Sequence, residues 1–379
     1  MNKMRRLIFL VLLIVLCLAS PRWCYANEIS AMENELLSEL PVQETEQSLK
    51  SITNNRISFM DLFRKILNRE FGFNEIVCYF KKMIFVCLKN NSRLMCNLAL
   101  LCVLSSFFES LSDSFSDKTA SGIGSFVVAL IFMSLVLQSV QSVIDTSKEV
   151  ISNTLGFSKA LISLFLAAAC VTAGTQNALM YQGSTVAVLF VAQKVVQVFL
   201  FRFVEFYLAI VIINYILGGD VLKMFLEQLK AFASLLLKAS LVFVISIHSI
   251  EGLLAPTAMI FRNSVLNKAI SAIPGVGASA ALFSQTIFGV ATVVKNGIGV
   301  AGMFAIMFIA LTPLIELAVI VLIYRMTSVL LGVMLNKQLA SCVLEISDGL
   351  LLVVKAVLTI VVIMLIMIGM MTAFTGGIL

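Results

Sequence analysis

Residues 297–324 read GIGVAGMFAIMFIALTPLIELAVIVLIY and carry a single charged side chain, Glu316. About 20 apolar residues in a helix are enough to cross the hydrocarbon of a bilayer. The whole chain has the same character, since 60% of its residues are hydrophobic and only 13% are charged. Soluble domains carry about 25% charged residues. The sequence therefore predicts an all-α polytopic membrane protein.

Other apolar runs predict seven or eight transmembrane helices within a membrane domain over residues 94–379. We expect spans near residues 94–111, 123–144, 158–176, 184–216, 232–254, 297–324 and 350–374. The run 184–216 is long enough for one tilted helix or two. Residues 270–294 are apolar but rich in Gly, Ala and Ser, and a re-entrant hairpin is one interpretation of them.

The N-terminal part predicts a secreted leader and an extracytoplasmic segment. Residues 1–26 have a basic start, an apolar run and a small-residue exit, which indicates a signal peptide cleaved after Ala26; an uncleaved anchor is the alternative. Residues 27–93 then form an extracytoplasmic part: residues 27–55 are polar and begin acidic, and residues 56–93 have the helical spacing of an amphipathic helix. That helix either lies on a membrane surface or packs within an ectodomain.

Several function classes receive no support from composition or motifs. Removing residues 1–26 takes away four of the 27 basic residues, which leaves 23 basic against 21 acidic residues and argues against nucleic-acid binding. Eight cysteines without a C-x-x-C pair, and a single histidine, favour neither a metal site nor a cofactor. No nucleotide-binding loop, nucleophile elbow or metalloprotease motif is present, so we expect no enzymatic activity.

Special backbone residues concentrate between residues 273 and 313. Prolines and glycines break helices or let two helices approach closely, so packing and a broken-helix gate are both open interpretations. The candidates are Pro274, Gly275, Gly277, Gly297, Gly299, Gly302 and Pro313.

Charged residues inside apolar runs are the other candidates, because they usually face a partner, a cavity or a pore. Glu316 follows Pro313 by three residues and is either a pore-facing carboxylate or a structural one, and Lys295 precedes the glycines. Arg202 and Glu205 have the spacing of a local ion pair.

His248 and Glu251 share the three-residue spacing of Arg202 and Glu205, but they supply too few ligands for a metal, so structural hydrogen bonding is the better interpretation.

The chain resembles the stage III sporulation protein AE family of endospore-forming bacteria. The resemblance rests on the I-P-x-x-G stretch at 273–277, the K-N-x-x-G-x-x-G stretch at 295–302, Pro313 and the Tyr324-Arg325 pair. Phe157-Ser158-Lys159-Ala160 is similar to the start of the family's third span. The family tends to carry a lysine after Pro313, where this chain has Glu316.

This resemblance implies a non-enzymatic component of the sporulation channel or export apparatus that connects mother cell and forespore. It implies a mother-cell-derived membrane around the forespore, an oligomer with other membrane proteins, a ring-forming extracytoplasmic protein and a separate ATPase. The alternative from the residues themselves is a secondary transporter, with a site formed by Glu316 and the 273–302 region.

Overall fold

The chain folds entirely into helices over the residues that the computed structural model describes, which are 40–55, 57–67, 73–114, 118–173, 175–217, 221–271, 277–333 and 337–375. The prediction of an all-α protein is confirmed for these ranges. The signal-peptide prediction, residues 1–26, lies outside them. In chain order the elements are α3 (Val42–Thr53), α4 (Phe59–Leu67), α5 (Phe73–Asn90), α6 (Ser92–Ser114), α7 (Lys118–Ala173), α8 (Thr175–Lys194), η1 (Val195–Leu200), α9 (Phe201–Ile216), α10 (Lys223–Ser271), α11 (Gly277–Val333) and α12 (Lys337–Thr375).

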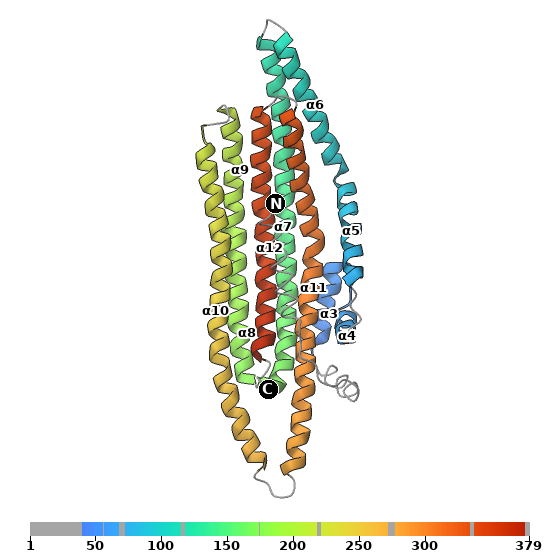
Figure 1. Cartoon of the computed structure of the whole chain (residues 1–379), viewed down its shortest axis with the longest axis vertical. Coiled ribbons are helices and arrows are strands. Elements are labelled where there is room, and N and C mark those ends of the chain that lie inside the picture. The colour runs from blue at the N-terminus through green and yellow to red at the C-terminus, as the bar shows by residue number, and fades with distance from the viewer. Residues whose placement is uncertain are drawn as a thin grey trace.

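Helix α12 lies at the centre of a bundle of long helices (Figure 1). It contacts α11, α10, α7 and α9, so it is enclosed on most of its circumference. Leu350, Val353, Ala356 and Val357 of α12 are all fully buried. The axis of the subunit is therefore filled by a packed helix.

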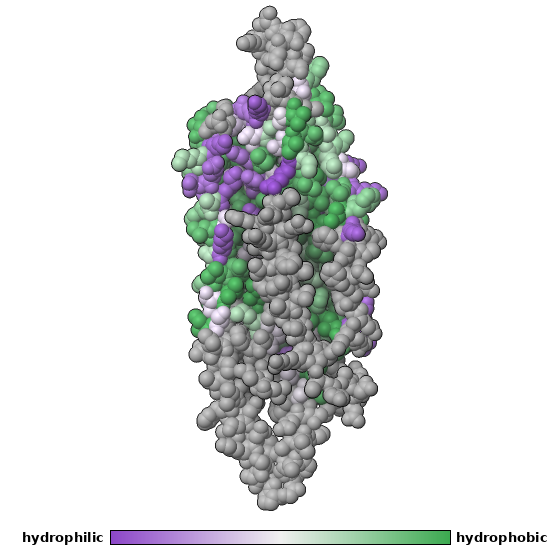
Figure 2. Space-filling view, viewed as in Figure 1, coloured by the Kyte–Doolittle hydropathy of each residue, from purple (hydrophilic) through white to green (hydrophobic). Residues whose placement is uncertain are grey.

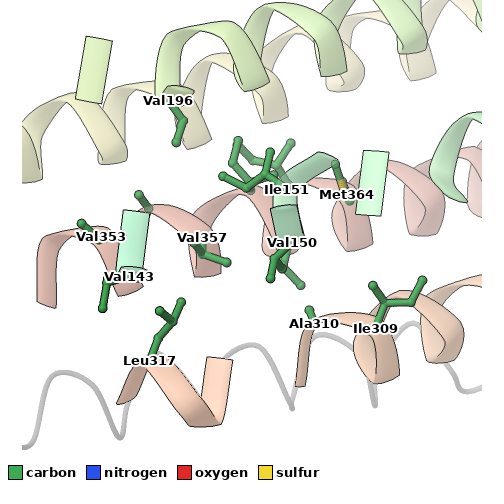
Figure 3. Packing of buried hydrophobic residues seen from close by; sticks show 14 of the residues in the cluster. Val143, Val150, Ile151, Val196, Ile309, Ala310, Leu317, Val353, Val357 and Met364 are labelled. Carbon is green, nitrogen blue, oxygen red and sulfur yellow. The ribbon is translucent and has the colours of Figure 1, made fainter. Parts of the chain in front are cut away.

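The core between α7, α11 and α12 is built from aliphatic side chains of similar size. Figure 3 shows Val150 of α7 on the side of Ala310 in α11, and Ile151 on the other side, toward Val196 of η1. Buried β-branched and aliphatic residues adopt few rotamers and fill the space between helices densely.

Five helical runs are long and apolar enough to cross a membrane within the described residues. They are Leu130–Cys170, Thr185–Ile216, Lys223–Ile247, Gly289–Val333 and Lys337–Thr372, while Ser92–Phe107 is a shorter apolar helix. The expected seven or eight spans are not confirmed, because the predicted spans 123–144 and 158–176 are joined in the single helix α7. Residues 184–216 likewise form one continuous run through α8, η1 and α9.

The re-entrant hairpin expected over residues 270–294 is not confirmed either. Residues 277–294 are the first turns of α11, and residues 272–276 lie outside the described ranges. Helix α11 is one piece of 57 residues, which at 1.5 Å per residue is about 85 Å long. A bilayer core is about 30 Å thick. The long helices therefore extend well beyond the hydrocarbon.

The amphipathic segment predicted after residue 56 packs against the bundle. Helix α4 contacts α11, and Phe59, Leu62 and Phe63 are buried. The ring of Phe59 lies 6.4 Å from that of Phe157 in α7, and the hydroxyl of Thr45 in α3 donates to the carbonyl oxygen of Ala160, 3.2 Å away. Helix α4 therefore packs against the bundle, on α11 and α7, while the extracytoplasmic placement of residues 27–93 stays a prediction.

The corner between α3 and α4 is held by the carboxylate of Glu46. Helix α3 ends where Asn54 adopts a left-handed conformation, φ 52°, which asparagine tolerates better than most residues. The backbone N–H groups of Phe59 and Met60 then donate to Glu46 Oε2 at 2.7 and 3.1 Å, and Lys50 Nζ lies 2.9 Å from Oε1. Burial raises the pKa of Glu46, but these partners outweigh it and hold the pKa below its usual range.

We expect Glu46→Gln to loosen this corner at neutral pH by about 1–2 kcal/mol, since it replaces a charged cap of α4 by a neutral one. The lowered pKa means that the stabilisation is fully present above the ordinary glutamate pKa and is lost as the pH falls through the folded value. Hydrogen exchange of residues 57–67 in the full-length protein should be faster in the variant at neutral pH, and the difference should shrink on acidification. Glu44→Gln is the matched control, because Glu44 is exposed on the same helix. An equal effect of both changes would contradict the role given to Glu46.

Candidate functional site

Polar groups and small residues gather at two levels of the apolar bundle. One level is the glycine contact, defined as Gly297, Gly299 and Gly302 of α11 together with the side chains that cover them. The other is the ion-pair cluster, defined as Lys230 of α10, Arg325 of α11 and Asp348 of α12. The first was predicted from the sequence and the second was not.

The glycine contact brings three different elements against α11. A Cβ atom on Gly297 would lie 2.8 Å from Phe63 Cε2 of α4. A Cβ on Gly299 would overlap the side chain of Thr372 in α12. A Cβ on Gly302 would overlap Leu161 of α7, with Cδ1 only 2.7 Å away. The three glycines thus let α4, α12 and α7 approach the α11 backbone.

The backbone does not break at these positions, which corrects one of the two interpretations drawn from the sequence. Helix α11 continues from Gly277 through Gly297, Gly299, Gly302 and Pro313 to Val333. Packing therefore accounts for the three glycines that lie in the described core. Pro274 and Gly275 lie outside the described residues, and Gly277 is the first residue of the helix.

Lys295 lies one turn before Gly299 and is fully buried. Within the described part of the chain, its Nζ and the Oδ1 of the neighbouring Asn296 are buried without a hydrogen-bond partner. A buried ammonium group without a partner costs free energy that the surrounding packing must supply. Lys295 is thus a fully buried amine without a hydrogen-bond partner among the described residues, and whether it is an intramembrane charge stays a prediction.

Glu316 is only partly buried and lies on a different part of α11. The interval of 14 residues from Gly302 corresponds to about 21 Å of helix, so the two do not form one site. Among the described residues Glu316 has no ion pair. It is near Cys87 of α5, since burial and then the charge of Glu316 raise the pKa of that thiol.

Arg202 and Glu205 neutralise each other locally, as their spacing predicted. Arg202 Nη1 lies 3.0 Å from Glu205 Oε2 on one turn of α9, and the arginine side chain is 79% exposed. The side chains of His248 and Glu251 lie outside the described part of the structure.

The ion-pair cluster joins the consecutive helices α11 and α12 to the more distant α10. Asp348 Oδ2 lies 3.1 Å from Lys230 Nζ, and Asp348 Oδ1 lies 3.1 Å from Arg325 Nη2. The Asp348 side chain is 29% exposed, that of Lys230 27%, and that of Arg325 45%. One carboxylate therefore compensates two cations at the edge of the bundle. The signal that sequence reasoning overlooked was Asp348 itself, which with Glu345 is one of two acidic residues in the largely apolar helix α12.

Hydrogen bonds around the cluster set the register of its helices. The Tyr207 hydroxyl of α9 donates to the carbonyl oxygen of Glu345 at 3.2 Å, and the Ser347 hydroxyl donates to that of Val321 at 3.3 Å. The Gln338 amide donates to the carbonyl oxygen of Tyr215 at 2.7 Å. A small open pocket lies beside them and is lined by Val211, Asn214, Tyr215, Gln338, Ser341, Cys342 and Glu345.

In the described ranges, no three His, Cys, Asp or Glu side chains come together as a metal ion would require. The cluster consequently offers fixed charges rather than ligands for a metal. Its arrangement suits the attraction of ions or of a charged partner.

We expect Gly302→Ala to lower the stability of the protein, because Leu161 must move to admit the new methyl group. Overpacking of this kind costs about 1–3 kcal/mol, which exceeds the helix-propensity gain of about 1 kcal/mol. Gly289→Ala is the matched control on the same helix, since nothing lies within 4 Å of its Cβ position. Thermal unfolding in detergent, followed through reaction of the buried Cys102 and Cys342 with a thiol dye, measures both. Equal stability of the two variants would refute the close contact.

We expect Asp348→Asn to destabilise the bundle by about 1–2 kcal/mol, because it leaves two cations without their shared counter-charge. Asp145→Asn is the control, since the Asp145 side chain is 59% exposed and lies 4.0 Å from Lys148 within one helix. The same thermal assay should show a lower midpoint for the first variant only. An unchanged midpoint would mean that the two ion pairs contribute nothing net.

A family model described as stage III sporulation protein AE matches residues 57–375. That range includes the glycine contact, the ion-pair cluster and every helix from α4 to α12. No curated protein and no solved structure matches the chain.

Proposed function

The chain belongs to the stage III sporulation protein AE family, and we propose that it is a membrane component of the channel or export apparatus between mother cell and forespore. The family match over most of the chain carries this proposal, together with a bundle of long apolar helices. A membrane protein with a sporulation role follows from these two observations. The connection of two cells is the step that we propose.

In this proposal the protein acts as a structural and conducting part and not as an enzyme. At and around the ion-pair cluster the polar side chains are engaged in helix contacts and ion pairs, as Tyr207, Lys230 and Arg325 are. We place it in the mother-cell-derived membrane that surrounds the forespore. Its partners would be other membrane proteins of the apparatus, a ring-forming extracytoplasmic protein and a separate ATPase.

The central position of α12 bears on where a passage would run. Because α12 fills the axis of the subunit, a passage within this assembly would lie along the outside of the bundle, between subunits. This favours an oligomer in which several chains share one passage.

The positions of the candidate groups do not support a secondary transporter with a site at Glu316 and the 273–302 region. Such a site needs its groups within one cavity, whereas Glu316 and Gly302 are about 21 Å apart along α11. Glu316 instead lies toward α5. The geometry therefore gives no support to a secondary transporter.

Deletion of the gene should block spore development after engulfment and leave vegetative growth unchanged. The reason is that a component of a mother cell–forespore connection has no task in a cell that is not sporulating. Counts of heat-resistant spores, growth curves and microscopy of the arrested stage measure the outcome, with a restored wild-type copy as control. Normal spore counts, or slow growth of vegetative cells, would overturn the proposal.

A further inference from the structure

A line of basic side chains runs along the outside of the bundle from the ion-pair cluster. We name it the basic stripe and define it as Lys223, Lys230 and Lys238 of α10, Arg325 of α11 and Lys355 of α12. On α10 the lysines recur at intervals of about two turns, which keeps them on one side of the helix. Figure 2 shows hydrophilic surface on the upper part of the face where α10 and α12 lie in Figure 1, with hydrophobic surface beside it.

The members of the basic stripe are close enough to act on one another. Lys230 and Arg325 share Asp348 at 3.1 Å each. The charges of Asp348, Arg325 and Lys238 all act on Lys355. The three α10 lysines therefore belong to one group of interacting charges together with Arg325 of α11 and Lys355 of α12.

The stripe lies on helical runs that are long and apolar enough to cross a membrane, namely Lys223–Ile247, Gly289–Val333 and Lys337–Thr372. On the same turns of α10, Phe232 is 49% exposed and Leu235 is 62% exposed. Beside Arg325 on α11, Met326 is 57% exposed. Large apolar side chains exposed in this way are typical of a surface that faces hydrocarbon.

Charge is not balanced along the stripe. The acidic groups that act on it are Glu227, Glu345 and Asp348, so five basic side chains face three acidic ones. Within the described residues, Lys238 and Lys355 have no ion-pair partner. Charged side chains at bilayer depth require water or a partner, because hydrocarbon excludes them.

We infer that the basic stripe faces a water-filled passage and favours small anions, such as carboxylates and phosphates, over cations. This inference rests on the proposed function and specifies the class of solute for that passage. An open row of fixed positive charges raises the local concentration of anions and repels cations. Exposed apolar residues on the neighbouring faces keep the rest of the helices in lipid, so only the side that carries the basic stripe faces water.

Cysteine labelling in membranes of sporulating cells tests the inference in the assembled apparatus. Lys355→Cys and Lys238→Cys are made separately in the full-length chain after its native cysteines have been replaced by alanine. Each is reacted with a water-soluble methanethiosulfonate that carries a sulfonate, and with the trimethylammonium analogue. We expect the anionic reagent to react faster by about tenfold, and added salt to reduce the ratio. Leu235→Cys is the control and should react with neither reagent.

The possible results separate the inference from the function on which it rests. No reaction at either stripe position would mean that protein or lipid covers the stripe, and it would overturn the inference. Equal rates, or a faster reaction with the cationic reagent, would overturn the preference for anions. Reaction at Leu235→Cys would overturn the statement that the exposed apolar residues beside the stripe face lipid.

A genetic experiment distinguishes the inference about the basic stripe from the proposed function. We expect Lys238→Gln combined with Lys355→Gln to reduce spore formation about tenfold, while Lys194→Gln, at an exposed lysine on α8, leaves it unchanged. If the double variant sporulates normally while deletion of the gene blocks development, the stripe inference fails and the proposed function stands. If deletion has no effect, the proposed function fails, whatever the labelling shows.

Discussion

Close packing of α11 against its neighbours is the contact on which the rest of the structure depends. Apolar helices in lipid gain little from the hydrophobic effect when they associate, so they rely on shape and on small residues. Gly299 and Gly302 remove the side chains that would hold α12 and α7 away, and Ala301, Ala305 and Ala310 are buried beside them. Helix α12 can then occupy the centre, with α7, α8, α9, α10 and α11 in contact with it.

Much of this architecture could be predicted from local patterns. The apolar runs predicted helices, and the spacing of Arg202 and Glu205 predicted their ion pair. Close helix contacts at the small residues were one of two interpretations left open. Each of these properties depends on residues that are neighbours in the sequence. The packed position of α4, which depends on Phe63 meeting Gly297, remained one of two alternatives.

Properties that depend on distant segments could not be read in the same way. The predicted spans 123–144 and 158–176 leave Asp145 and Glu149 between them, but these residues are exposed on one side of the continuous helix α7 while Val150 and Ile151 are buried on the other. A hydropathy average along the chain combines the residues of both sides. It therefore predicts a break between two spans where the helix in fact continues. The partners of Asp348 come from α10 and α11, so no pattern within α12 could indicate them.

The unbroken course of α11 also makes it a rigid rod between two ends of the molecule. Gly297, which contacts α4, and Arg325, which binds Asp348, are separated by about 42 Å of continuous helix. Pro313 lies between these two contacts and removes one backbone donor, yet the helix continues through it to Val333. The α4 contact and the ion-pair cluster are therefore joined by one continuous element. Helix α11 thus connects the α4 contact at the periphery of the bundle to the ion-pair cluster on its charged surface.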